Sequence, residues 1–237
     1  MPLFHWLFTS CDAAWRRHAR FLAVGWTLGA ALCLYAAWAG EGLYYYLDYM
    51  WNGRPNAGLM TLVSGYCLVA CGMGFAVAAR RARREPKGEN EALGFTLGAI
   101  GCIVLAFDEV AQLHERAAHF LVRHHVPKPF GVFDVDSYIF LLYLGGLVHV
   151  LVLLWPTRRP LEPAMLPLMV AIACMGVSEA LDQIPWEWMN HDTQQIVGAF
   201  EEAYKVFASW TLAMVGLLVA DEATRRVNDT PGAAHPG

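Results

Sequence analysis

The chain has 237 residues with a mean hydropathy of +0.35, and only 16% of its residues are charged, against about 25% in a typical soluble domain. This composition excludes an ordinary soluble domain, and a net charge of −4 argues against a nucleic-acid partner. We therefore expect an all-α integral membrane protein without a separate soluble domain.

Six stretches of the sequence are suited to membrane-spanning helices, each of which needs roughly 20 helical residues. In chain order the predicted spans are Phe21–Gly40, Pro55–Ala79, Ala92–Gln112, Ser137–Thr157, Pro163–Asp182 and Glu202–Ala220. Residues 21–222 would form the six-helix domain, with an interfacial segment at 1–20 before it and a disordered tail at 223–237 after it.

Arginine and lysine predict the orientation of this bundle. They cluster before the first span, between spans two and three, between spans four and five, and after span six (Arg16, Arg17, Arg20, Arg80, Arg81, Arg83, Arg84, Lys87, Arg158, Arg159, Arg225 and Arg226). With six crossings all these clusters lie on one side, and positively charged loops stay in the cytoplasm. We therefore predict that both termini are cytoplasmic.

Three of the apolar stretches are too short to cross a bilayer without drawing in acidic neighbours. The charge-free runs Ala92–Phe107, Pro163–Ser178 and Val206–Ala220 have only 15 or 16 residues. Each is bordered by acid on its outer side, at Asp108 and Glu109, at Glu179, and at Glu201 and Glu202. Ionisable groups at membrane depth are costly and usually functional, so the sequence predicts an acidic site in the outer half of the bundle.

The acids of span three lie on a helix face that begins with glycine. If the helix continues past Asp108, about 100° per residue places Gln112, Glu115 and His119 on the same face as Asp108. Towards the other end this face carries Gly94, Gly98 and Gly101, which favour close helix packing. We expect Asp108 to point into the bundle and His114 to reach it only if the helix breaks nearby.

Spans five and six supply the other acids. Glu202 shares a face with the small residues Ser209, Ala213, Gly216 and Ala220, so it is expected to face inward. Lys205 follows Glu202 by three residues and Glu201 by four, and it can neutralise either. Glu179 and Asp182 are spaced to serve one cavity. We therefore expect spans three, five and six to pack together around these groups.

Carboxylates with a histidine are ligands for Zn, Fe or Mn. The leading interpretation is a metal-dependent membrane enzyme that acts on a lipid or lipid-linked substrate at headgroup depth. Its predicted ligands are Asp108, Glu109, Glu179, Asp182 and Glu202, and its predicted catalytic or proton-moving groups are His114, Glu115 and Lys205. The alternatives are a proton- or cation-coupled transporter and a structural or assembly subunit in which the charges only join helices.

Two other groups of polar residues lie inside spans. His149 in span four is expected to form an interhelical hydrogen bond. Cys67 and Cys71 share a helix face, where small residues in helix packing are favoured over a soft-metal site.

The string Asp108-Glu109-x-x-Gln112-Leu113-His114-Glu115, followed by Glu179 and then Glu201-Glu202, resembles a pattern in uncharacterised bacterial polytopic membrane proteins. The resemblance covers spans three to six. It implies a multi-pass protein of the bacterial inner membrane and no particular activity.

Overall fold

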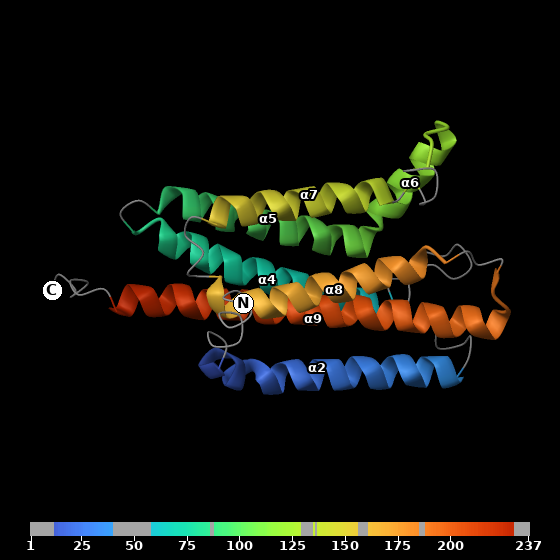
Figure 1. Cartoon of the computed structure of the whole chain (residues 1–237), viewed down its shortest axis with the longest axis horizontal. Coiled ribbons are helices and arrows are strands. Elements are labelled where there is room, and N and C mark those ends of the chain that lie inside the picture. Colours follow the sequence, from blue (N-terminus) through green and yellow to red (C-terminus); the bar gives the residue numbers. More distant parts are fainter. Residues whose placement is uncertain are drawn as a thin grey trace, which may run out of the picture.

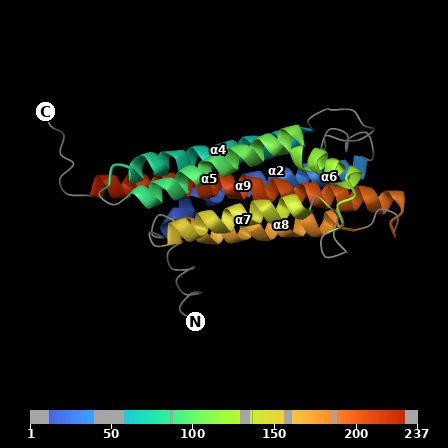
Figure 2. The ribbon, with the colours of Figure 1, turned by 90° about the horizontal axis from the view of Figure 1, so that it is seen from above.

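The computed structural model describes residues 12–39, 58–85, 88–128, 135, 137–155, 161–184 and 188–229, and over these residues the regular structure is entirely helical. Long helices run side by side along one axis (Figures 1 and 2). The described helices are α2 (Asp12–Ala39), α4 (Leu59–Ala82), α5 (Glu89–Ala111), α6 (Leu113–Arg123), α7 (Ser137–Leu154), the short 3₁₀ helix η3 (Glu162–Ala164), α8 (Met165–Asp182) and α9 (His191–Asp229). The short α6 turns away from the common axis (Figure 1).

Five described segments are long and apolar enough to cross a membrane: Met60–Ala82, Glu89–Ala111, Ser137–Leu154, Glu162–Asp182 and His191–Arg226. They coincide with the second to sixth predicted spans. The described structure thus confirms the prediction of an all-α protein with several helices long and apolar enough to cross a membrane. The first predicted span falls on α2 up to Ala39, with Gly40 outside the described residues. Residues 223–229, expected in the tail, instead continue α9.

The helices pack around α4 and α9. Helix α4 contacts α5 on one side and α9 on the other, α7 packs against α5, and both α8 and α2 pack against α9. The prediction that spans three, five and six pack directly together is therefore wrong in part, because α4 lies between α5 and α9. The glycines of span three explain this. A Cβ at Gly94 would meet Leu154 of α7, and one at Gly98 would meet Phe75 of α4, so this face turns towards α7 and α4.

Helix α2 is attached to α9 by aromatic side chains. The rings of Phe21 and Trp210 stack with centroids 4.8 Å apart, and Trp26 and Phe207 stack at 4.9 Å. The indole nitrogen of Trp26 donates to the hydroxyl of Thr211 at 3.1 Å, and that of Trp210 donates to the carbonyl of Phe21 at 3.0 Å. These pairs satisfy buried indole N–H groups and hold α2 alongside α9.

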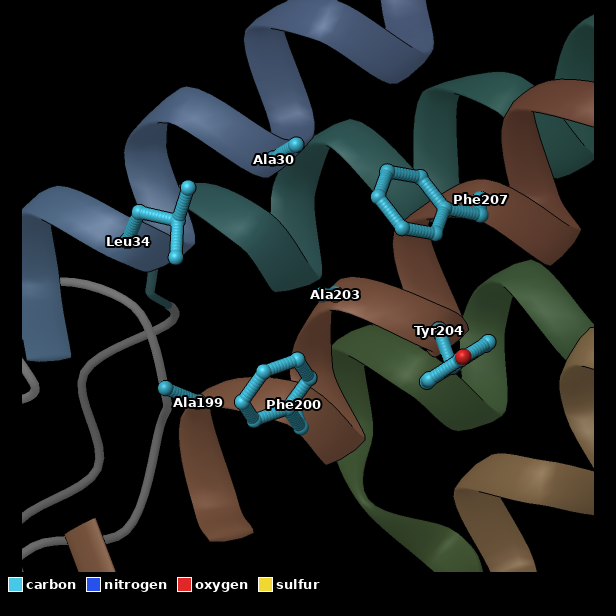
Figure 3. Close-up of a pocket in the computed structure, with 7 residues that line it drawn as sticks. All are labelled: Ala30, Leu34, Ala199, Phe200, Ala203, Tyr204 and Phe207. Carbon is cyan, nitrogen blue, oxygen red and sulfur yellow. The ribbon is translucent and has the colours of Figure 1, made fainter. Parts of the chain in front are cut away.

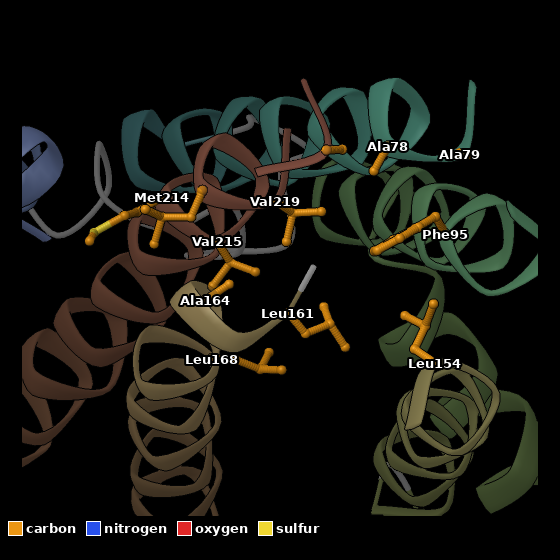
Figure 4. Close-up of a cluster of buried hydrophobic side chains, with 12 residues drawn as sticks. Ala78, Ala79, Phe95, Leu154, Leu161, Ala164, Leu168, Met214, Val215 and Val219 are labelled. Carbon is orange, nitrogen blue, oxygen red and sulfur yellow. The ribbon is translucent and has the colours of Figure 1, made fainter. Parts of the chain in front are cut away.

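The apolar core lies at the end of the bundle where the arginines gather. Ala78, Ala79, Phe95, Leu154, Leu161, Ala164, Leu168, Met214, Val215 and Val219 bring α4, α5, α7, α8 and α9 together there (Figure 4). The start of α2, the end of α4 and the end of α9 all lie at this end (Figure 1, left). The predicted site acids of α5, α8 and α9 lie at the opposite end, while Glu91 of α5 and Glu222 of α9 pair with Arg226 at the arginine end. Most of the apolar core thus fills one half of the bundle, and the predicted site lies in the other.

Helices α4 and α9 approach each other through two glycines. A Cβ added at Gly216 would lie 2.6 Å from the Cα of Cys71, and one added at Gly74 would overlap the backbone of Gly216. In both cases the obstacle is backbone, which cannot rotate away as a flexible side chain would. The small residues on this face of α9, predicted as a packing surface, thus pack on α4.

Replacing Gly216 with alanine should therefore destabilise the bundle. The new methyl group must push α4 and α9 apart, and overpacking of this kind costs about 1–3 kcal/mol. The same change at Gly101, whose added Cβ would meet nothing within 4 Å, is the matched control and should leave stability unchanged or raise it slightly. Unfolding of the purified protein in detergent measures both. Equal stability of Gly216→Ala and Gly101→Ala would show that the two helices are not in close contact.

Candidate functional site

The polar site begins where α5 is interrupted at Gln112. This residue has φ 50° and ψ 49°, the left-handed conformation, and its side chain is buried. Its N–H donates to the carbonyl of Asp108 at 2.6 Å. A left-handed conformation costs a non-glycine residue about 1–2 kcal/mol. The break ends α5 at Ala111 and starts α6 at Leu113 in a new direction. The single continuous face expected for Asp108, Gln112, Glu115 and His119 is therefore not formed.

The break brings His114 back onto Asp108. The backbone N–H of His114 donates to Oδ1 of Asp108 at 2.7 Å, and the imidazole Nδ1 lies 3.0 Å from Oδ2. The hydroxyl of Tyr143, on α7, also donates to the Asp108 carboxylate. Three donors therefore surround a carboxylate that is 6% exposed, while the His114 side chain is 35% exposed. Asp108 points inward as predicted, and His114 connects it to the surface.

Lys205 is the centre of a second polar cluster. Its ammonium nitrogen lies 2.8 Å from Oε1 of Glu202 and 3.4 Å from Oε1 of Glu201. Glu109 of α5 also interacts electrostatically with this ammonium group. Glu202 is only 3% exposed, as its position on the small-residue face predicted. Two carboxylates of α9 thus contact one ammonium group, and a third, from α5, interacts with it electrostatically.

The remaining predicted site residues lie around these two clusters. On α8, the hydroxyl of Ser178 donates to the carbonyl of Glu201 at 3.2 Å and ties that helix to α9. Glu179, next to it, is partly buried, whereas Asp182 is exposed. Glu115 lies in the first turn of α6, and its side chain is outside the described part of the structure.

The two clusters use neighbouring residues of α5 but face different helices. Asp108 turns to α6 and α7, and Glu109 turns to α9. Among the described residues no three or more His, Cys, Asp or Glu side chains are arranged to hold a metal ion. Of the predicted ligands, Asp108 thus belongs to the His114 cluster, whereas Glu109 and Glu202 interact with Lys205.

Sequence reasoning missed two contributors to the site. Tyr143 was not singled out, although it is one of few side chains with a hydrogen-bonding group in the apolar span Ser137–Leu154. Gln112 was noted only as part of a polar face. A glutamine does not predict a helix break, because glycine is the usual residue at a left-handed position.

An apolar cavity of about 150 Å³ lies on another face of α9, next to α2 (Figure 3). Its walls are Ala30, Leu34, Ala199, Phe200, Ala203, Tyr204 and Phe207. At about 100° per residue, the lining residues of α9 face away from Glu202 and Lys205. The cavity is therefore separate from the polar site.

Residues 50–220 match the profile of a family described as a domain of unknown function, DUF8692. The matched range includes every predicted site residue. Comparison with curated proteins and with solved structures finds no match.

The geometry of the Lys205 cluster predicts unequal effects of removing its members. Lys205→Met leaves three carboxylates without their common ammonium partner and should destabilise the protein by about 3 kcal/mol or more. Glu202→Gln leaves Lys205 with Glu201 and Glu109 and should cost only about 1 kcal/mol. Combining the two changes should recover part of the stability lost in Lys205→Met.

Thermal or denaturant unfolding in detergent measures these differences. Arg225→Met is the matched control, because Arg225 is 69% exposed in its ion pair with Glu222 and such pairs contribute little. A Lys205→Met protein as stable as Arg225→Met would contradict the buried cluster.

Proposed function

The chain belongs to the DUF8692 family, and we propose that it is a six-span membrane protein whose Lys205 cluster takes up and releases protons or a cation in a coupled transport cycle. The observation that carries the proposal is that the Lys205 ammonium group contacts both Glu201 and Glu202 and also interacts electrostatically with Glu109. The three carboxylates share one ammonium partner. A proton or a cation can replace the ammonium group as the partner of any of these carboxylates. Sites of this kind in membrane helices mark proton and ion pathways.

The ammonium group of Lys205 can exchange places with a bound cation by moving between carboxylate partners. Lys205 is a flexible side chain whose Nζ is 2.8 Å from Glu202 and 3.4 Å from Glu201. When a cation binds these carboxylates, the ammonium can shift towards Glu109. When the cation leaves, the ammonium returns and keeps the empty site neutralised. Because unpaired charge at this depth costs several kcal/mol, both states need such compensation.

The Asp108 cluster offers a path between this site and the outer surface. The partly exposed imidazole of His114 contacts the buried carboxylate of Asp108, and histidine is the side chain best suited to pass protons near neutral pH. Asp108 and Glu109 are consecutive, so one peptide unit separates the two clusters. We assign His114 and Asp108 to proton movement and Glu109, Glu201, Glu202 and Lys205 to binding.

A metal-dependent enzyme acting on a lipid or lipid-linked substrate is the second candidate. It is favoured by the carboxylate–imidazole pair of Asp108 and His114, which suits a Zn, Fe or Mn ligand set. In that case Glu109, Glu179, Asp182 and Glu202 supply the further ligands, and Glu115 or Lys205 moves protons. The division of these residues into two clusters places this candidate after the transporter.

Cation binding to the purified protein tests the proposal. Added in turn at fixed pH, at least one of Na⁺, K⁺, Mg²⁺, Mn²⁺ and Zn²⁺ should bind to the protein, measured by isothermal titration calorimetry. Glu202→Gln should weaken that binding at least about tenfold, because one charged carboxylate is a major share of the site. Glu222→Gln is the control, since Glu222 pairs with Arg225 and Arg226 at the other end of α9.

A wild-type protein that binds none of these ions, or a Glu202→Gln protein that binds them as wild type does, would contradict the transport proposal. Elemental analysis separates the second candidate. Stoichiometric Zn, Fe or Mn that is retained during purification and lost in Glu202→Gln would favour the enzyme.

We also propose that α2 is the first of six spans, that both termini are cytoplasmic, and that the protein resides in the bacterial inner membrane. Helix α2 lies alongside α9, and the basic residues of α4 and α9 lie at one end of the bundle. This one-sided charge supports the cytoplasmic assignment, and the resemblance to bacterial polytopic proteins supports the inner membrane.

The topology predicts that a reporter fused after Arg226 is active only in the cytoplasm. A cysteine placed at the exposed Asn190 should react with an impermeant thiol reagent added to intact spheroplasts, relative to wild type as the background. Labelling of Asn190→Cys only after permeabilisation would reverse the orientation and place the polar site on the cytoplasmic side.

A further inference from the structure

Helix α7 lies at the edge of the bundle and buries almost nothing within the chain. It packs against α5, and of its residues only the last, Leu154, is buried. Figures 1 and 2 show α7 along the outside of the helices. An apolar helix in this position is ordinarily covered by lipid.

One face of α7 does not suit a lipid environment. At 100° per residue Leu142, Gly145, Gly146, His149 and Val152 point in similar directions, and all five are exposed. A Cβ added at Gly145 or Gly146 would meet no atom within 4 Å. No packing within the described chain therefore requires glycine at these two positions, although glycine weakens a helix by about 1 kcal/mol relative to alanine.

His149 is the decisive residue of this face. It lies five residues before Leu154, the last residue of α7, or about 7.5 Å along the helix, and its side chain makes no hydrogen bond within the described part of the structure. The predicted hydrogen bond to a neighbouring helix of the same chain is thus not found there. An imidazole is too short to reach the interface as lysine or arginine does, and an unsatisfied polar group in hydrocarbon costs several kcal/mol.

We propose that this face of α7 is a dimer interface, and that a second copy of the chain supplies the missing partner of His149. All copies insert in the same orientation, so a two-fold axis along the membrane normal places each residue at the same depth as its counterpart. His149 then meets His149 of the other copy. A neutral imidazole carries one donor and one acceptor, so the N–H of one ring can donate to the unprotonated nitrogen of the other.

The glycines make this contact possible. Gly145 and Gly146 lie one turn from His149 on the same face, and small residues let membrane helices approach closely enough for interhelical hydrogen bonds. In the dimer they would meet their own counterparts. The two glycines that no packing within the described part of the chain requires would therefore become the point of closest approach between two copies.

Disulfide cross-linking in native membranes tests the interface. Gly145→Cys should form a dimer-sized, reducible product on mild oxidation, because α-carbons in close helix contact lie within the 4.4–6.8 Å that a disulfide needs. Gly176→Cys is the matched control, since Gly176 on α8 is also exposed with nothing within 4 Å. Wild type reports any cross-linking by the native cysteines.

The role of His149 is measured separately, by the dimer fraction of labelled protein in liposomes at varied protein-to-lipid ratio. His149→Leu should weaken association about 3- to 20-fold, the effect of one interhelical hydrogen bond. Gly145→Leu should weaken it further, and Gly176→Leu should have no effect.

Three results would each overturn the proposal. They are a monomer at every ratio, equal cross-linking from Gly145→Cys and Gly176→Cys, and association unchanged by His149→Leu. A reducible product of another size would assign the face to a different protein and not to a second copy.

Discussion

The competition of three carboxylates for the ammonium group of Lys205 is the interaction on which the outer half of this bundle depends. Glu201 and Glu202 belong to α9, and Glu109 belongs to α5. Helix α4 packs against both α5 and α9, so this electrostatic interaction acts between two helices whose packing is largely indirect. A bundle that uses charge in this way needs a rigid frame elsewhere, since buried charges contribute little net stability of their own.

The apolar half supplies that frame. The α4–α9 contact at Gly74 and Gly216 allows no side chain between the two backbones, and the core cluster fills the same half with interdigitating side chains. Van der Waals packing of this kind is the main force between helices in lipid, where apolar burial gives no advantage over acyl chains. Close packing therefore fixes the helices at one end, and the polar groups at the other end can change partners without loosening the fold.

Sequence reasoning recovered the features that depend on one helix at a time. Apolar length located the spans, the small-residue face of span six placed Glu202 inside, and the i+3 and i+4 spacing identified Lys205 as the partner of Glu202 and Glu201. It failed for features that depend on which helix is the neighbour. A glycine face shows that something packs closely but not what, and the face at Gly94 and Gly98 turned out to serve α7 and α4. The division of Asp108 and Glu109 between two clusters follows from that arrangement.

The helix break at Gln112 shows why the site could not be fully assembled from the pattern of residues. No glycine or proline marks it, so a continuous helix was the natural expectation. The break is stabilised instead by the hydrogen bonds that it allows. Asp108 accepts hydrogen bonds from the backbone N–H and the imidazole of His114, and so provides a partner for an N–H group in the first turn of α6. Charge-assisted bonds of this kind contribute roughly 1.5–3 kcal/mol each, enough to offset the left-handed conformation. The carboxylate that caps α6 is thus the one that would receive a proton from His114. Protonation of Asp108 would weaken both bonds, so any proton movement through this residue also acts on the geometry of the break.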